Sequence, residues 1–214
     1  MNIKQFLLKP IYKIAAPFYM SKIKKGVTKK DFTIISNDCC GGVVYHRIGK
    51  RFSSPFINLY LEHSDFFLLL SDLNYYLSEE LKEYISDEKY PIGILGNNKP
   101  IKIHFLHYKS FEEAKDSWSR RKERIIKNKL LIMLNLTNSL DKKYVDDCIK
   151  KLELLNFENY VIFSRFASQN PNVVKIDFSD LKSFHNAQIL APQKYPFKLH
   201  IDQIEYAKLF KRFN

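Results

Sequence analysis

The residues best suited to chemistry in this chain lie in one short loop, Ser36-Asn37-Asp38-Cys39-Cys40-Gly41-Gly42. The apolar run before it, residues 32–35, has the composition of a buried strand, and residues 43–48 can begin a helix. A loop between a strand and a helix points backbone N–H groups, and the positive end of the helix dipole, at the carboxyl edge of a sheet. We therefore expect an anion-binding site made by four residues, Ser36, Asn37, Gly41 and Gly42. The loop lacks the spacing of the GxGxxG and P-loop motifs, and glycines that only permit a tight turn explain the pattern about as well.

Four side chains are candidates for catalysis. Asp38 in the loop, or His107 near the end of a predicted strand, would serve as a general base. Cys39 or its neighbour Cys40 would serve as a nucleophile with His107 as its base, because a cysteine at a helix N-terminus can have a lowered pKa. Both residue types also have structural roles, since hydrogen-bonded histidines and buried, inert cysteines are common. We name no metal ligand, because no Cys/His spacing typical of zinc occurs. The sequence identifies no cofactor.

Two arginines are candidate phosphate ligands. Ser110 and Glu113 form a capping box at the start of a predicted helix that extends to about residue 127. Arg121 lies within the apolar stripe of this helix, and Arg124 lies on its flank. An arginine in such a stripe needs an anionic partner, which is either an internal carboxylate or a phosphate group of a ligand.

Polar residues also follow two later predicted strands. Asn138 follows the strand 129–136, and Arg165 follows the strand 160–163. Strands and helices alternate from residue 32 onwards, which predicts an α/β fold with an open, largely parallel sheet and helices on both faces, a Rossmann-like layering. Ligands usually bind at the carboxyl ends of the strands of such a sheet, so Asn138 and Arg165 join the predicted phosphate-binding set.

The pattern predicts several further elements. A long helix follows Ser64 and extends to residue 85, and residues 90–95 and 101–108 form two strands of a hairpin. The period of the second strand puts His104 and His107 on opposite faces. A helix over residues 141–155 turns Tyr144 inward, and a short helix over residues 202–213 closes the chain.

The N-terminal residues 1–30 contain eight lysines and no acidic residue, and so carry most of the formal net charge of +12. Apolar residues alternate with the lysines, and Pro10 and Pro17 interrupt them, which predicts a broken, basic amphipathic helix. This arm either lies on an anionic membrane surface or packs on its own domain or a partner subunit. Nucleic acid is an unfavoured partner, because the segment has no arginine. We expect residues 31–214 to form a single α/β domain.

The compartment follows from cysteine use and from hydropathy. Three cysteines, two of them adjacent, do not form a disulfide framework. No run of about eighteen uncharged apolar residues occurs, and the N-terminus lacks the apolar region of a secretory signal. We therefore expect a cytoplasmic protein, peripheral on the inner face of the membrane if the arm binds lipid. The sequence does not indicate an oligomeric state.

Five blocks of sequence resemble a known family: ISNDCCGGVVYHRIG, SPFINLYL, YPIGIL, HFLHY and WSRRKERI. They occur in this order between residues 32 and 163, and together they are similar to the bacterial DUF1919 family, whose members are often labelled exopolysaccharide or capsular polysaccharide biosynthesis proteins. The opening loop of that family more often reads Ser-Asn-Asn-Cys-Trp-Gly-Gly, so Asp38 and Cys40 are departures from its pattern. The resemblance implies an α/β fold and a role in surface polysaccharide assembly.

Three functional hypotheses remain at this point. The first is a transferase that takes a group from a nucleotide sugar or lipid-linked glycan, with the loop and the two arginines on the diphosphate. The second is a non-catalytic scaffold that binds a glycan or a partner at the membrane, for which the thirteen tyrosines could supply an aromatic groove. The third is a cysteine-dependent acyltransferase.

Overall fold

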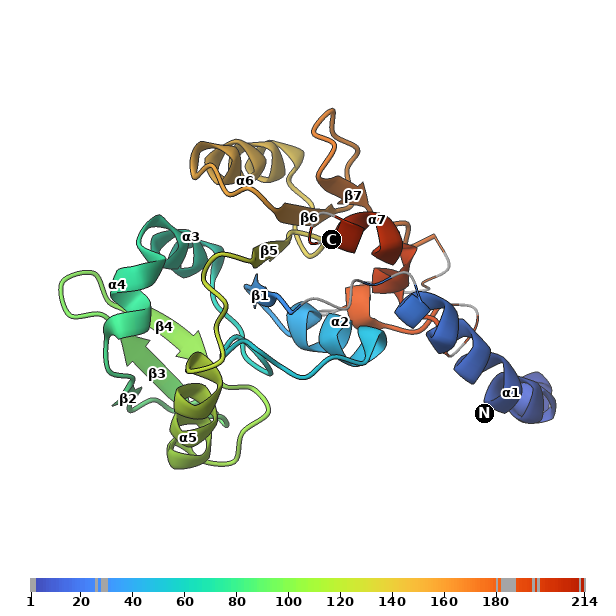
Figure 1. Cartoon of the computed structure of the whole chain (residues 1–214), viewed down its shortest axis with the longest axis horizontal. Coiled ribbons are helices and arrows are strands. Elements are labelled where there is room, and N and C mark those ends of the chain that lie inside the picture. The colour runs from blue at the N-terminus through green and yellow to red at the C-terminus, as the bar shows by residue number, and fades with distance from the viewer. Residues whose placement is uncertain are drawn as a thin grey trace.

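A computed structural model describes residues 3–25, 27, 31–179, 181, 188–193, 195, 197–211 and 213, with side chains from residue 14 onwards. A four-stranded parallel sheet with strand order β1-β5-β6-β7 forms its centre (Figure 1). The four strands are β1 (Thr33–Ser36), β5 (Leu130–Asn135), β6 (Tyr160–Ser164) and β7 (Val173–Lys175). Their parallel registers bring the carboxyl ends of β1, β5 and β6 to the same edge of the sheet.

Helices cover both faces of this sheet. Alternate strand residues point to opposite faces, so Ile35 and Leu134 pack in one core with α3 (His63–Ser71) and α6 (Lys142–Leu154). Ile34 and Met133 pack in a second core with α2 (Cys40–Ile48) and α7 (Tyr206–Lys211). The predicted α/β fold with helices on both faces is confirmed.

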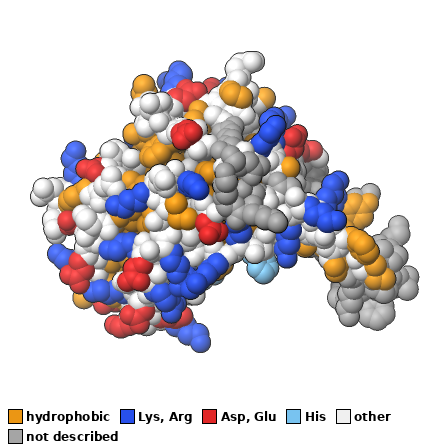
Figure 2. Space-filling model, viewed as in Figure 1, with side chains coloured by type: hydrophobic (Ala, Val, Ile, Leu, Met, Phe, Trp, Pro, Cys, Tyr) orange, Lys and Arg blue, Asp and Glu red, His pale blue; other side chains and the backbone are white. Residues whose placement is uncertain are grey.

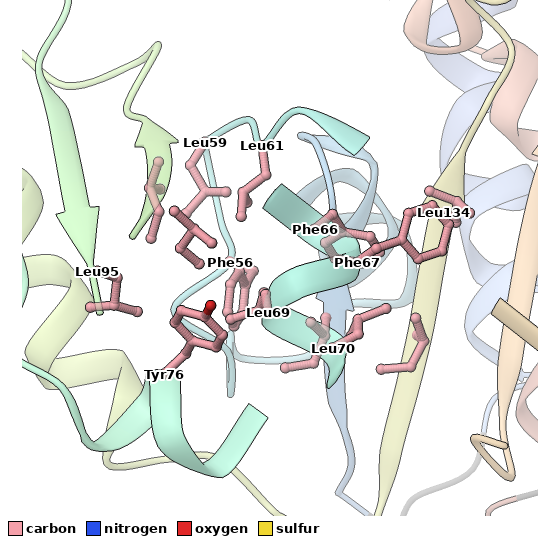
Figure 3. Close-up of a cluster of buried hydrophobic side chains, with 14 of the residues drawn as sticks. Phe56, Leu59, Leu61, Phe66, Phe67, Leu69, Leu70, Tyr76, Leu95 and Leu134 are labelled. Atoms are coloured by element: carbon pink, nitrogen blue, oxygen red, sulfur yellow. The ribbon is translucent and has the colours of Figure 1, made fainter. Parts of the chain in front are cut away.

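A small antiparallel sheet accompanies the parallel one. It contains β2 (Lys82–Tyr84), β3 (Ile92–Leu95) and β4 (Ile101–His104), and β3 and β4 form the predicted hairpin around Gly96, whose φ of 88° suits glycine. The segment 56–61 joins the two sheets, because Tyr60 N donates to His104 O at 2.8 Å and Leu61 N donates to Asn37 O at 2.8 Å. Figure 3 shows the apolar side chains of this segment between the small sheet and α3.

Two predicted elements are wrong in extent. The long helix after Ser64 is divided into α3 and α4 (Leu73–Ser78), because Asp72 leaves the helical conformation and caps α4 by accepting a bond from Tyr75 N. Its expected last turn is strand β2. The strand expected over residues 101–108 ends at His104, so His107 lies in a turn and the face assigned to it does not apply.

The N-terminal helix α1 (Ile3–Lys25) continues through Pro10 and Pro17, which corrects the prediction of a broken helix. Each proline omits one backbone donor but does not end the helix here. Its last turns pack on the domain, where Ile23 is buried in the core shared by α2 and α7. Ile14 and Phe18 remain 66% and 75% exposed, and Figure 2 shows apolar side chains on the surface of this arm. Among the described residues no helix is long and apolar enough to cross a membrane.

The C-terminal segment packs on α1 and α2. It contains η1 (Gln188–Leu190), η2 (His200–Gln203) and α7, none of which belongs to a sheet. The helix expected over residues 202–213 is therefore a short 3-10 turn followed by one short helix. Arg47 of α2 forms an ion pair with Asp202 at 3.0 Å, and both side chains are nearly buried. This ion pair holds η2 of the C-terminal segment against α2, the helix that follows the first strand of the parallel sheet.

Candidate active site at the carboxyl edge of the sheet

The loop between β1 and α2 is shaped by its own side chains. Ser36 Oγ donates to Asp38 O at 2.7 Å and accepts from Gly41 N at 3.3 Å. A Cβ at position 41 would lie 2.5 Å from Ser36 Oγ, so the close approach of α2 to β1 requires glycine there. Ser36 and Gly41 therefore have structural contacts in this structure, within the loop in which we expected ligand contacts.

Asp38 lies at the centre of this edge. Its Oδ1 accepts from Cys40 N at 2.8 Å, and its Oδ2 accepts from Asn135 Nδ2 at 2.6 Å. The carboxylate thus occupies the start of α2, where the helix dipole favours a negative charge. A ligand phosphate at this helix start would have to displace Asp38, so the predicted backbone anion site is already filled by the protein.

An amide pair fixes the ends of β1 and β5. Asn135 N donates to Asn37 Oδ1 at 2.8 Å, Asn37 Nδ2 donates to Asn135 O at 3.4 Å, and both residues are buried. The Asn135 side-chain oxygen accepts from Thr137 N and Thr137 Oγ1 at 3.0 and 2.7 Å. Because every polar atom of the Asn135 side chain has a partner, the orientation of Asp38 is strongly determined.

A histidine and a tyrosine that the sequence analysis did not select complete this cluster. His63 Nε2 lies 3.1 Å from Asn135 O, and His63 Nδ1 lies 2.8 Å from the Tyr144 hydroxyl. A carbonyl oxygen can only accept, so the neutral imidazole carries its proton on Nε2 and accepts from Tyr144 on Nδ1. Tyr144 is 41% exposed, which corrects the prediction that it faces inward. We call Asp38, Asn135, His63 and Tyr144 the carboxyl-edge cluster.

Burial and nearby carboxylates keep the tyrosines of this edge protonated. Burial, a contact with Cys148 and the charge of Glu62 raise the pKa of Tyr144 to about 12. Burial first, then a hydrogen bond to Glu62 and the charge of Asp38, raise the pKa of Tyr60 above its ordinary value. These phenols are proton donors at neutral pH, and the acceptors at this edge are the two carboxylates.

The cysteines of the loop are in surroundings that suppress thiolate formation. Burial and the charge of Asp38 raise the pKa of Cys39 to about 12, and its sulfur lies 3.8 Å from Leu59 O. Cys40 is fully buried, and burial followed by Asp38 raises its pKa well above the ordinary value. A thiolate nucleophile at this helix start is therefore unfavourable, because burial and the charge of Asp38 outweigh the dipole that would have favoured it.

The later strand ends contribute a cation to the same edge. Arg165, directly after β6, donates from Nε to Thr137 O at 2.7 Å and lies over the Phe178 ring at 4.7 Å. Asn138, next to Thr137, is exposed. Arg165 and Asn138 thus lie where the strand pattern placed them, beside the end of β5.

The structure does not bring Arg121 and Arg124 to this edge. Arg124 Nη1 donates to Phe52 O at 3.4 Å, and the neighbouring Ser53 accepts a bond from Thr33, the first residue of β1. The reason is topological. The helix α5 (Phe111–Lys122) leads into β5, so its C-terminal end must lie near the amino end of that strand.

His107 is also separate from the cluster. It is exposed in the turn after β4, and within the described part of the chain its side chain forms no hydrogen bond or ion pair. Nothing at this position orients an imidazole towards Asp38 or Cys39. His63 lies two residues after Leu61, whose N–H donates to Asn37 O, and this pairing is visible only in the structure.

A surface hollow and a cluster of metal-binding side chains are the other kinds of ligand site to consider. A hollow of about 310 Å³ lies beside the amino ends of β6 and β7, with Tyr160, Val173 and Leu209 in its wall. The described residues contain no group of three His, Cys, Asp or Glu side chains arranged to hold a metal ion. We place the candidate active site at the carboxyl edge, because acid, amide, imidazole and phenol groups are connected there by hydrogen bonds.

Comparison with known proteins assigns the chain to a family. A family model described as "Domain of unknown function (DUF1919)" matches residues 11–210. An uncharacterised protein of Haemophilus influenzae is 32% identical over 164 residues, which cover 77% of this chain and 76% of that protein. The family match includes the β1–α2 loop and the strands that carry the carboxyl-edge cluster. The chain belongs to the DUF1919 family.

Proposed function

We propose that this protein is a transferase of bacterial exopolysaccharide or capsule assembly, which moves a sugar or another group from a phosphate-bearing donor to a hydroxyl of a glycan precursor. The donor is a nucleotide sugar or a lipid-linked intermediate. The observation that carries the proposal is the carboxyl-edge cluster, in which Asp38 is held by Asn135 beside the His63–Tyr144 pair. The resemblance to proteins labelled for polysaccharide biosynthesis supplies the substrate class.

In this mechanism Asp38 is the general base. The acceptor hydroxyl gives its proton to the Asp38 carboxylate while its oxygen bonds to the transferred carbon, and the bond from that carbon to the donor phosphate oxygen breaks. The electron pair leaves with the phosphate, whose charge is stabilised by the Arg165 guanidinium. Asn135 holds the Asp38 carboxylate in place, and both carboxylate oxygens of Asp38 keep lone pairs that can accept from the acceptor hydroxyl.

The experiment that tests this proposal is a turnover assay with a panel of nucleotide sugars and a glycan acceptor fraction, with release of the nucleotide as the readout. Asp38→Asn should reduce turnover by a factor of about 10²–10⁴, as expected for the loss of a general base. Asp87→Asn is the matched control, because Asp87 is exposed in a loop remote from β1 in the chain. Equal turnover by Asp38→Asn and the wild type would contradict the assigned role of Asp38.

A non-catalytic glycan-binding protein is the second candidate, and one observation favours it. The start of α2 is filled by Asp38 and Ser36, so the loop does not offer the open backbone donors typical of a nucleotide-phosphate site. This alternative predicts no binding across the nucleotide-sugar panel and retained binding of a polysaccharide fraction.

We also propose that α1 attaches the protein to the cytoplasmic face of an anionic membrane. The support is the exposure of Ile14 and Phe18 on a helix that carries three lysines in its last turn. The double variant Ile14→Ser/Phe18→Ser should sediment less with anionic vesicles, and attachment should weaken as salt rises. Leu154→Ser is the control, because Leu154 is 85% exposed on α6. Equal sedimentation of the double variant and the wild type would refute attachment through α1.

A further inference from the structure

Four arginines gather around Phe52, away from the carboxyl-edge cluster. Arg121 lies with its guanidinium carbon 5.5 Å from the centre of the Phe52 ring, and Arg124 Nη1 donates to Phe52 O at 3.4 Å. Arg51 directly precedes Phe52 in the chain, and Arg120 directly precedes Arg121 on α5. We call Arg51, Arg120, Arg121 and Arg124 the arginine cluster. Figure 2 shows basic side chains gathered on this face, near the position of α5 in Figure 1.

The hydrogen bonds made by this cluster end on neutral oxygens. Arg121 Nη1 donates to the Tyr108 hydroxyl at 2.6 Å and to Ile57 O at 3.4 Å. Within the described part of the chain, no ion pair joins any of the four arginines to a carboxylate. The internal carboxylate that the sequence pattern allowed as a partner of Arg121 is therefore replaced by a phenol and a carbonyl group.

The charge of the cluster is not balanced locally. Burial first, then the charges of Arg51, Arg120 and Arg121, lower the pKa of Arg124, and the opposing charge comes from Glu123. The negative end of the α5 dipole contributes about half a charge. Together with Glu123 this leaves an excess of about 2.5 positive charges, which is close to the charge of a phosphate ester or a diphosphate.

We propose that the arginine cluster is a second anion site, which binds the phosphate groups of a ligand that is not the reacting donor. Guanidinium forks fit phosphate oxygens in pairs, and two of the four, Arg51 and Arg120, are exposed. The site lies towards the amino end of β1, because the neighbouring Ser53 accepts from Thr33 Oγ1 at 3.0 Å. Asp38 lies beyond the opposite end of that strand, so one small donor cannot contact both sites through the same phosphate.

Two sources can supply this phosphate. One is a soluble diphosphate compound and the other is the headgroup of an anionic lipid. The lipid source is compatible with the position of α1, whose Lys24 side chain lies against Gly49, two residues before Arg51. This contact places a cation of α1 beside the segment that leads to Arg51.

Titration of the full-length protein with sodium pyrophosphate tests the site, and sedimentation with phosphatidic acid vesicles separates the two sources. The test variant is Arg51→Gln/Arg120→Gln, because neither side chain has a packing role that would endanger folding. Removal of two positive charges should weaken the binding of pyrophosphate, of the vesicles or of both by a factor of about ten or more. Arg51→Lys/Arg120→Lys should show a smaller loss, because charge is kept and the planar fork is lost.

The control is Lys143→Gln/Lys150→Gln on the exposed face of α6, which should bind like the wild type. Loss of pyrophosphate binding identifies a soluble ligand, and loss of vesicle binding alone identifies a lipid headgroup. Wild-type binding of both probes by Arg51→Gln/Arg120→Gln, or no binding of either probe by the wild type, would overturn the proposal. Asp38→Asn should bind both probes normally, so failure of the transferase proposal and failure of this one are distinguishable.

Discussion

Replacement of Gly41 by alanine tests the packing that holds the β1–α2 loop. The new Cβ would lie 2.5 Å from Ser36 Oγ, 3.1 Å from Ser36 Cβ and 3.2 Å from Ile34 Cγ2. These atoms belong to the buried strand β1, and Ser36 Oγ is held by Asp38 O, so overpacking costs about 1–3 kcal/mol. The helix propensity of alanine offsets up to about 1 kcal/mol. We expect a net loss of about 1–2 kcal/mol in the free energy of unfolding.

Urea unfolding followed by fluorescence measures this loss, because the chain has a single tryptophan, Trp118, which is buried. Gly42→Ala is the matched control, since its Cβ would lie 3.3 and 3.9 Å from two methyl groups of Ile57 and 3.7 Å from Asn58 Oδ1, with no atom closer. Addition of Ser36→Gly to Gly41→Ala removes the two closest atoms and should restore part of the stability. Wild-type stability of Gly41→Ala, or a larger loss in Gly42→Ala, would refute the reasoning.

Three further predictions concern the rest of the framework. Arg47→Gln should lower the free energy of unfolding by about 3–5 kcal/mol, because it leaves the buried Asp202 carboxylate without its cation. The double variant Arg47→Gln/Asp202→Asn should lose less stability than the sum of the losses in the two single variants. Nitrogen NMR should find the proton of His63 on Nε2 in the wild type and also in Tyr144→Phe, because the Asn135 carbonyl remains its acceptor; a dominant Nδ1–H form in the wild type contradicts the assigned hydrogen bonds. At pH 9, iodoacetamide should modify Cys39 much more slowly in the folded protein than in the protein unfolded in urea. The reason is that folding raises the pKa of Cys39 to about 12, so that the thiolate forms only as the pH rises towards that value. Equal rates in the two states would show that the thiol is ionised in the folded protein.

Much of the fold could be predicted because strand periodicity and capping chemistry are local. The strand that became β5 is an uninterrupted apolar run, and Ser110 caps α5 by accepting from Glu113 N at 3.2 Å. The long helix failed at Asp72, where a side chain that can cap the next helix competes with continuation of the first. The local sequence is compatible with one long helix and with two shorter ones, and tertiary packing stabilises the break at Asp72.

The candidate site was predicted only where it depends on strand ends. Asp38 and Arg165 follow strands, so the parallel order brings them to one edge. Arg121 and Arg124 were assigned to that edge from charge alone, although a crossover helix ends where the next strand begins. His63 and Tyr144 are 81 residues apart, and no local pattern indicates that they meet. Such pairs depend on how α3 and α6 pack on the same face of the sheet.

Hydrogen exchange in the presence of a nucleotide sugar tests most directly the claim that the carboxyl-edge cluster is the active site. We expect added protection in residues 37–42 and 135–138 of the wild type, and loss of that protection in Asp38→Asn. Protection confined to the hollow beside β7, or no protection with any member of the panel, would contradict it.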